Sequence, residues 1–222
     1  MLKKTKVQVF PSILAADFGH LADEAKKAEQ AGADGLHLDV MDGHFVPNLT
    51  MGPKTVAAIH RATKLFLDVH LMIYHPFEYI ERFVEAGANR ITFHFEATED
   101  VKETLAYIKK CNVQAGLAFS PETSHEMVDK FLGLADMILL MTVNPGFGGQ
   151  SFMPQVLEKV EYTSEMANRL DLPLEIQVDG GIDDKTAPLC VKAGAQLLVA
   201  GTYLYQAPNM KEAIQKLRGA GK

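Results

Sequence analysis

Short apolar runs alternate with longer amphipathic segments along the whole chain. The runs predict eight β-strands, at residues 7–10, 35–39, 66–71, 90–93, 114–119, 137–142, 174–178 and 196–200. Segments with apolar residues at helical spacing follow them, at about 17–31, 54–62, 77–86, 100–110, 123–132, 154–169, 183–192 and 209–218. Because each strand is followed by one helix, the pattern predicts repeated βα units.

Several predicted strands are apolar at nearly every position, as in the run of Met, Ile and Leu at 137–141. Such strands are buried on both faces, which is typical of parallel sheets covered by helices. Ala-Gly-Ala ends three predicted helices just before a strand, at 31–33, 86–88 and 193–195. We therefore expect one α/β domain over residues 1–222, a (β/α)8 TIM barrel. An open doubly wound sheet is the alternative, but no G-x-G-x-x-G turn follows the first predicted strand.

The charge balance of the chain restricts its partners. Its 222 residues include 22 Lys and Arg against 28 Asp and Glu, and the basic residues are scattered. This pattern argues against nucleic acid and against a membrane surface as partners. The most apolar stretch, 131–143, contains Asp136 and is shorter than the roughly 20 residues that span a bilayer. Since the chain has only two cysteines, we expect a cytoplasmic protein without a disulfide framework.

Polar side chains occur at the carboxyl ends of three predicted strands. His37 and Asp39 share one face of the second strand, His70 lies near the end of the third, and Asp179 follows the seventh. In a barrel these ends meet at one opening, and two imidazoles with two carboxylates suit a divalent transition metal. One such residue alone is more often a hydrogen-bonded structural group. Four together favour a functional site, because burying ionisable groups without a purpose is costly.

Glycine-rich loops follow the last three predicted strands, as Asn-Pro-Gly-Phe-Gly-Gly-Gln at 144–150, Gly180-Gly181 and Gly201-Thr202. Glycine lets backbone N–H groups approach an anion closely, and barrels often bind phosphate at the loops after strands seven and eight. One glycine pair is more often an ordinary turn. Three neighbouring loops of this kind predict a phosphorylated substrate.

Several strings closely resemble the ribulose-phosphate 3-epimerase family, and the resemblance covers nearly the whole chain. The strings are PSILAADF at 11–18, HLDVMDG at 37–43, FVPN at 45–48, VHLM at 69–72, NPGFGGQ at 144–150 and VDGGI at 178–182. The resemblance implies a ribulose-phosphate-binding barrel that interconverts D-ribulose 5-phosphate and D-xylulose 5-phosphate in the pentose phosphate pathway. It further implies metal-assisted proton transfer by two carboxylates through a 2,3-enediolate.

The resemblance also implies roles for single residues. Asp39 would accept the proton and Asp179 would donate it. One divalent ion per subunit, with zinc favoured over iron, cobalt or manganese, would be held by His37, Asp39, His70 and Asp179. Substrate contacts would come from Ser12, His70, Gly146, Phe147, Gly148, Gly149, Asp179, Gly180, Gly181, Gly201 and Thr202. The family usually has serine where this chain has Thr202, so a hydroxyl is retained.

Two other functions fit parts of the sequence. An epimerase of a six-carbon sugar phosphate, such as D-allulose 6-phosphate, would share the barrel and its chemistry, although TMGP at 50–53 looks more like the pentulose enzyme. A noncatalytic sugar-phosphate sensor could lose ligands, whereas all four ligand positions are intact here. By resemblance we also expect a symmetric homo-oligomer, a dimer or a hexamer.

Two further groups of residues lie near the predicted strand ends. Three methionines would form either ordinary core or, by resemblance, an apolar wall near the reacting carbon: Met41, Met72 and Met141. Three histidines fall outside the matched ligand set: His44, His75 and His94. A hydrogen-bonded loop or core histidine is the commoner case for such positions.

Overall fold

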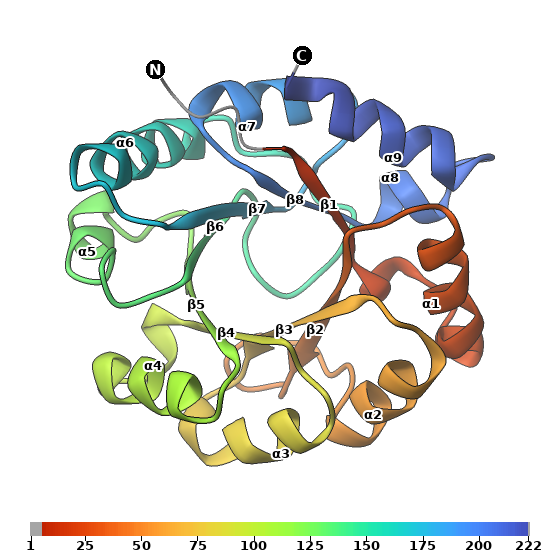
Figure 1. The fold of residues 1–222 in the computed structure, drawn as a ribbon, viewed down its shortest axis with the longest axis horizontal. Helices are drawn as coiled ribbons and strands as arrows, with labels where there is room; N and C mark the ends of the chain where they lie inside the picture. The colour runs from red at the N-terminus through yellow and green to blue at the C-terminus, as the bar shows by residue number, and fades with distance from the viewer. Residues whose placement is uncertain (1–5, 222) are drawn as a thin grey trace.

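The computed structural model describes residues 6–221, and its strands form one parallel sheet curled into a barrel (Figure 1). The strands are β1 (Gln8–Pro11), β2 (Gly35–Met41), β3 (Phe66–Met72), β4 (Arg90–His94), β5 (Gln114–Phe119), β6 (Met137–Met141), β7 (Glu175–Asp179) and β8 (Leu197–Ala200). They pair in the order β1-β8-β7-β6-β5-β4-β3-β2, with every neighbouring pair parallel. An isolated bridge between Ser12 and His37 links the ends of this order, so the barrel is nearly closed.

Helices surround the barrel on its outside (Figure 1). They are α1 (Leu21–Gln30), α2 (Pro53–Ala62), α3 (Ile80–Glu85), α4 (Val101–Lys110), α5 (His125–Asp129), α6 (Val156–Arg169), α7 (Ala187–Ala193), α8 (Thr202–Tyr205) and α9 (Met210–Arg218). Short 3-10 turns occur as well: η1 (Ile13–Ala15), η2 (Phe18–His20), η3 (Pro76–Tyr79), η4 (Phe95–Ala97) and η5 (Gly219–Gly221). The predicted (β/α)8 TIM barrel is therefore confirmed.

Several predicted helical segments are α-helical over only part of their length, and local hydrogen bonds explain two of these differences. The segment predicted at 17–31 begins with η2, because the Asp17 side chain accepts a hydrogen bond from the Gly19 N–H. The segment predicted at 183–192 becomes helical only at α7, because the Asp183 carboxylate accepts two backbone N–H groups in the preceding turn. The segment predicted at 123–132 is α-helical only at His125–Asp129. Helix α8 was not predicted, since one turn is too short to show periodicity.

Alternation along β2 places its side chains in two environments. Leu36, Leu38 and Val40 belong to the main hydrophobic core with residues of the surrounding helices. His37 and Asp39 are buried on the opposite, inner face of the strand. The register between β2 and β3 pairs Asp39 with His70, so polar groups of the two strands lie next to each other inside the barrel.

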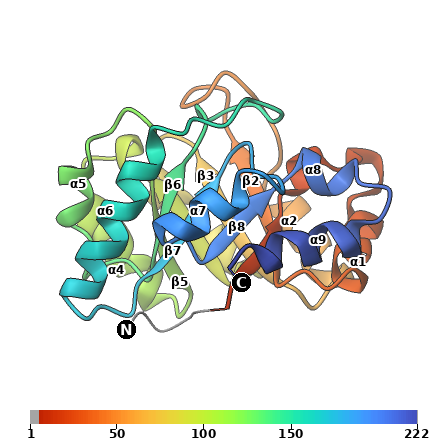
Figure 2. The same cartoon turned by 90° about the horizontal axis from the view of Figure 1, so that it is seen from above.

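The loops after β2 and β6 extend from the same end of the barrel, as the side view shows (Figure 2). The Asn48 side-chain amide donates a hydrogen bond of 2.8 Å to the Gly146 carbonyl and joins the two loops. In the β6 loop, the Gln150 side-chain amide donates to the carbonyls of Asn144 (2.7 Å) and Phe147 (2.8 Å). Both loops are thus held in defined positions above the strand ends.

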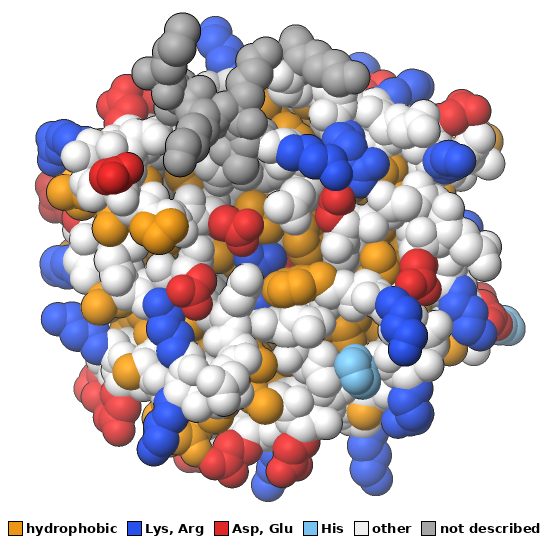
Figure 3. Space-filling model, in the orientation of Figure 1, with side chains coloured by type: hydrophobic (Ala, Val, Ile, Leu, Met, Phe, Trp, Pro, Cys, Tyr) orange, Lys and Arg blue, Asp and Glu red, His pale blue; other side chains and the backbone are white. Residues whose placement is uncertain are grey.

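The surface carries charges of both signs in mixed distribution. Figure 3 shows Lys and Arg side chains interspersed with Asp and Glu over one face of the molecule, without a block of one sign. Over residues 6–221, we find no helix with the length and apolar character needed to cross a membrane.

Candidate active site and metal centre

The strand ends bring the predicted ligand set together. His37 and Asp39 from β2, His70 from β3 and Asp179 from β7 each offer one ligand atom, and these atoms lie within 4.8 Å of one another. Both histidines are fully buried, whereas the Asp179 side chain is 16% exposed. The donors therefore form a cluster that is open to the outside mainly at Asp179.

The distances identify the atoms that face each other in the cluster. Asp39 Oδ1 lies 3.1 Å from His70 Nδ1 and 3.3 Å from His37 Nε2, and the two ring nitrogens are 3.2 Å apart. Asp179 Oδ2 lies 3.7 Å from His37 Nε2. Two imidazole nitrogens and two carboxylate oxygens are the donor set that zinc, iron, cobalt or manganese accepts, so the residues fit one divalent ion.

The two carboxylates have opposite pKa shifts. Burial raises the pKa of Asp39, but the charge of His37 and hydrogen bonds from His37 and His70 outweigh burial and hold that pKa well below its usual value. Burial and the charge of Asp39 raise the pKa of Asp179 to about 7. Asp179 therefore retains its proton in a pH range where Asp39 is ionised, which is the arrangement expected of an acid and a base in one site.

The orientation of His37 depends on three residues that sequence reasoning did not assign to the site. Asp68 Oδ2 lies 3.0 Å from His37 Nδ1. Arg90 Nε donates to Asp68 Oδ1 at 2.9 Å, and Gln177 Nε2 donates to Asp68 Oδ2 at 2.7 Å. His37 and these three partners are all buried inside the barrel. A signal for Asp68 was present, since it lies two residues before His70 and so on the same face of β3.

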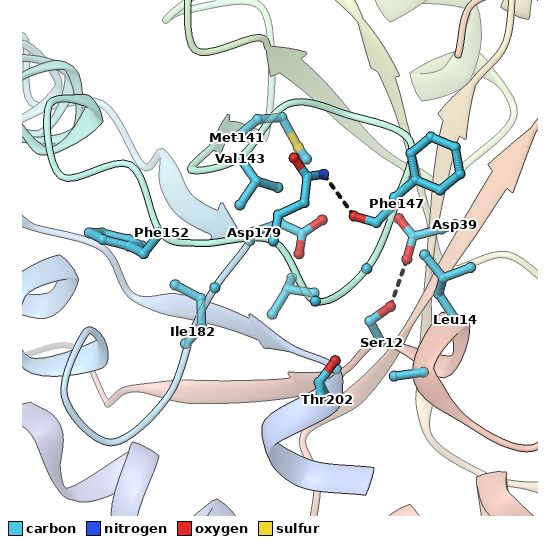
Figure 4. Close-up of a pocket in the computed structure, with 18 of the residues that line it drawn as sticks. Ser12, Leu14, Asp39, Met141, Val143, Phe147, Phe152, Asp179, Ile182 and Thr202 are labelled. Carbon is cyan, nitrogen blue, oxygen red and sulfur yellow. Dashed lines mark hydrogen bonds between the residues drawn. The ribbon is translucent and has the colours of Figure 1, made fainter. Parts of the chain in front are cut away.

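A cleft of about 520 Å³ opens above the cluster. Figure 4 shows Asp179 and Asp39 projecting into it from different strands, with Ser12 and Thr202 nearby. Ser12 Oγ donates a hydrogen bond of 2.7 Å to Asp39 Oδ2. The structure brings together ten of the residues predicted to contact substrate along this cleft: Ser12, Gly146, Phe147, Gly148, Gly149, Asp179, Gly180, Gly181, Gly201 and Thr202. His70, also predicted to contact substrate, is fully buried and lies outside the cleft lining.

Glycine is required where β7 leads into its loop. Gly180 has φ 121°, and a Cβ there would lie 2.5 Å from a methyl carbon of Val143. Gly181 has φ 64°, and a Cβ there would lie 2.7 Å from the backbone nitrogen of Phe152. Both positions combine a left-handed backbone with a close approach of the β6 loop. Only glycine allows the β6 and β7 loops to share one side of the cleft.

The methionines and the additional histidines have distinct positions. All three methionines named above are buried and line the cleft: Met41, Met72 and Met141. His44 and His75 are exposed loop residues, and His44 is held by Asp42. His94 differs from them, since it is fully buried and its Nε2 lies 2.9 Å from His70 Nε2.

The sequence is similar to one family of proteins over most of its length. The model of the ribulose-phosphate 3 epimerase family matches residues 8–205. The ribulose-phosphate 3-epimerase of Chlamydia pneumoniae is 56% identical over 99% of this chain and 97% of its own length. That of Bacillus subtilis is 47% identical over 96% of this chain and 99% of its own length.

Solved structures of lower identity support the fold alone. A 3-hexulose-6-phosphate synthase superposes with TM-score 0.68 at 19% identity, covering 97% of this chain and 99% of that chain. A structure of KGPDC from Streptococcus mutans superposes with TM-score 0.71 at 14% identity, covering 97% of both chains.

Fold and site together define a barrel enzyme with paired carboxylates and a candidate metal centre at the carboxyl ends of its strands. The sequence comparisons narrow this class to isomerases that act as epimerases. The chain belongs to the ribulose-phosphate 3-epimerase family.

Proposed function

We propose that this chain catalyses the reversible C3 epimerisation of D-ribulose 5-phosphate and D-xylulose 5-phosphate, a step of the pentose phosphate pathway. The observation that carries the proposal is the pair Asp39 and Asp179, which face one cleft from β2 and β7 and have opposite pKa shifts. Support also comes from the high identity to ribulose-phosphate 3-epimerases over nearly the whole chain.

The reaction needs two proton-transfer groups. Inverting a carbon next to a ketone removes a proton from one face and returns a proton to the other, whereas a single base would tend to restore the original configuration. Asp39, ionised and held by Ser12 and the two histidines, would accept the C3 proton. Asp179, protonated, would deliver a proton to the opposite face. The reverse reaction exchanges these roles.

The cluster would hold one divalent metal ion per subunit through His37, Asp39, His70 and Asp179, with zinc favoured. Such an ion supplies a Lewis acid that stabilises the negative charge of an enediolate. Burial lowers the pKa of His70 to about 4, so its imidazole is neutral near pH 7, the form that binds a cation.

The substrate would lie in the cleft with its phosphate at the glycine loops after β6, β7 and β8. These loops present exposed or half-buried backbone at Gly148, Gly149 and Gly201, and backbone N–H groups can bind an anion in a protein of net negative charge. Met41, Met72 and Met141 would form the apolar wall beside the reacting carbon.

The two carboxylates are tested by Asp39→Asn and Asp179→Asn. Each variant should lose at least about 10²-fold in epimerisation, the lower scale for a positioned acid or base. The variant that keeps the base for one epimer should still exchange the C3 proton of that epimer with deuterated solvent, without inversion.

Metal content is measured alongside, because both residues are also proposed ligands. Exchange is compared only between proteins with equal bound metal. Near wild-type epimerisation by both variants would contradict the two-carboxylate mechanism.

A separate assay identifies the substrate. It compares the turnover of D-ribulose 5-phosphate and D-allulose 6-phosphate side by side.

A further inference from the structure

We infer that His94 and Glu96 are positioning residues that fix the tautomer of His70. They hold its proton on Nε2, so that Nδ1 presents a lone pair to the metal centre. The inference rests on the proposed metal site. It concerns two residues that do not line the cleft and so cannot act by touching the substrate.

His70, His94 and Glu96 form a hydrogen-bonded relay that leads away from the cluster. His70 Nδ1 faces the cluster at 3.1 Å from Asp39 Oδ1, and His70 Nε2 points away from it toward His94 Nε2 at 2.9 Å. The two rings are stacked, with centroids 5.0 Å apart and planes inclined by 25°. On the far side of the second ring, His94 Nδ1 lies 3.1 Å from Glu96 Oε2.

Only one placement of protons satisfies this relay when a cation is bound. His70 Nδ1 must then offer a lone pair, so the proton of the neutral ring is on Nε2. That N–H needs an acceptor, and the atom within reach is His94 Nε2. His94 must therefore carry its own proton on Nδ1, where it donates to the Glu96 carboxylate. Glu96 thus determines the tautomer of His94, and His94 determines the tautomer of His70.

Glu96 is itself held in place by the loop that follows β5. Its Oε1 accepts a hydrogen bond of 2.9 Å from the Ser120 N–H and another from the Thr123 hydroxyl. The buried Lys159 of α6 donates to the carbonyls of Ser120 (2.8 Å) and Pro121 (3.0 Å) and fixes this loop from the other side. The relay therefore ends on a fixed part of the fold.

The other histidine of the cluster provides an internal comparison. His37 has a carboxylate directly behind its ring, with Asp68 Oδ2 at 3.0 Å from Nδ1. His70 has an imidazole between its ring and the carboxylate. Groups in this outer position orient metal-bound histidines, and their loss typically costs 10–100-fold in metal affinity. We expect the same scale for the relay.

The test measures the affinity of the protein for Co²⁺ by titrating the Co²⁺-loaded protein with increasing concentrations of a chelator. His94→Leu removes the acceptor and should weaken Co²⁺ binding about 10–100-fold. His94→Gln should bind within a few-fold of wild type, because its amide oxygen can accept the His70 N–H. Glu96→Gln should weaken binding by an intermediate amount. His75→Leu, an exposed histidine outside the relay, is the matched control and should leave the affinity unchanged.

The outcomes separate this inference from the proposed function. Wild-type Co²⁺ affinity together with an unchanged Co²⁺ absorption spectrum in His94→Leu would overturn the relay and leave the metal centre standing. A wild-type protein that binds no Co²⁺ would overturn the metal centre itself. If His94→Leu does not fold, Glu96→Gln decides, and wild-type affinity in that variant overturns the relay. Weakened binding with rescue by His94→Gln supports it.

Discussion

The single carboxylate of Asp68 contacts three buried side chains. It accepts from Arg90 and Gln177 and lies behind the His37 ring. Burial raises its pKa, but the charge of Arg90 and the hydrogen bonds from His37 and Gln177 outweigh burial and hold the pKa well below its usual value. A buried carboxylate with these partners stabilises the fold in its ionised form.

Asp68→Asn should therefore lower the free energy of unfolding at pH 7 by about 3 kcal/mol, because it leaves a buried Arg90 charge with an incomplete partner set. The folded-state pKa of Asp68 lies below the unfolded value of about 3.9, so its contribution is present above that pH and is lost as the pH falls. Denaturant titrations with metal removed by chelator should show the two proteins converging below about pH 4. A difference that stays constant from pH 7 to 3 would refute this account.

Gly148 allows a direct test of where the phosphate binds. A Cβ at this position would meet no protein atom within 4 Å, so a larger side chain should not disturb the fold. Gly148→Leu should raise KM for the phosphorylated sugar about tenfold with little change in kcat, because the side chain obstructs backbone approach to the phosphate. Gly133→Leu, equally unobstructed but away from the cleft, is the control for steady-state kinetics. An unchanged KM in Gly148→Leu would place the phosphate elsewhere.

Among the larger elements, the loops after β2 and β6 are joined by the side chain of Asn48. Its side-chain Nδ2 donates to Gly146, and its Oδ1 accepts from the Leu49 N–H. Asn48→Asp keeps the acceptor and removes the donor. We expect KM to rise about fivefold, the equivalent of one hydrogen bond of about 1 kcal/mol, with kcat changing less. Steady-state kinetics tests this, and an unaltered KM would show that the β6 loop is held without Asn48.

Most helices and strands could be predicted, because the spacing of apolar residues over a few positions shows which side chains are buried. Strands such as β5, found at its predicted bounds of Gln114–Phe119, are apolar runs that parallel sheets require. Element starts were less predictable. Asp17 and Asp183 each cap a turn with their side chains, and such local competition with helix formation leaves no trace in the apolar pattern.

Across the whole molecule, the residues that sequence reasoning missed in the site are those that contact His70 or Asp68 from other strands. The cluster that could hold a metal ion could be predicted, because each of its members lies at a strand end and barrels gather those ends. Gln177 reaches Asp68 over a sequence separation of 109, and His94 reaches His70 from the adjacent strand. Such contacts depend on register and ring orientation, which one sequence does not specify.

Metal removal should affect the whole molecule. Chelator should abolish epimerisation, and added Zn²⁺, Co²⁺, Mn²⁺ or Fe²⁺ should restore it, because the enediolate charge needs a Lewis acid. The loaded protein should also unfold at a higher temperature than the stripped protein, since a ligand that binds the folded state stabilises it. Full turnover by protein shown to be metal-free would contradict the proposal.

The opposed charge states of Asp39 and Asp179 have a consequence for repeated turnover. Under the proposed chemistry, each reaction leaves Asp39 with a proton and Asp179 without one, so the starting pair is not regenerated by catalysis itself. Asp179 is 16% exposed and Asp39 only 3%, so water reaches the donor far more readily than the acceptor. A recovery step, in which Asp39 loses a proton and Asp179 gains one, is thus needed before the same epimer can react again. The reversed pair is already the form that the opposite epimer requires, so a mixture of both epimers turns over without waiting for it.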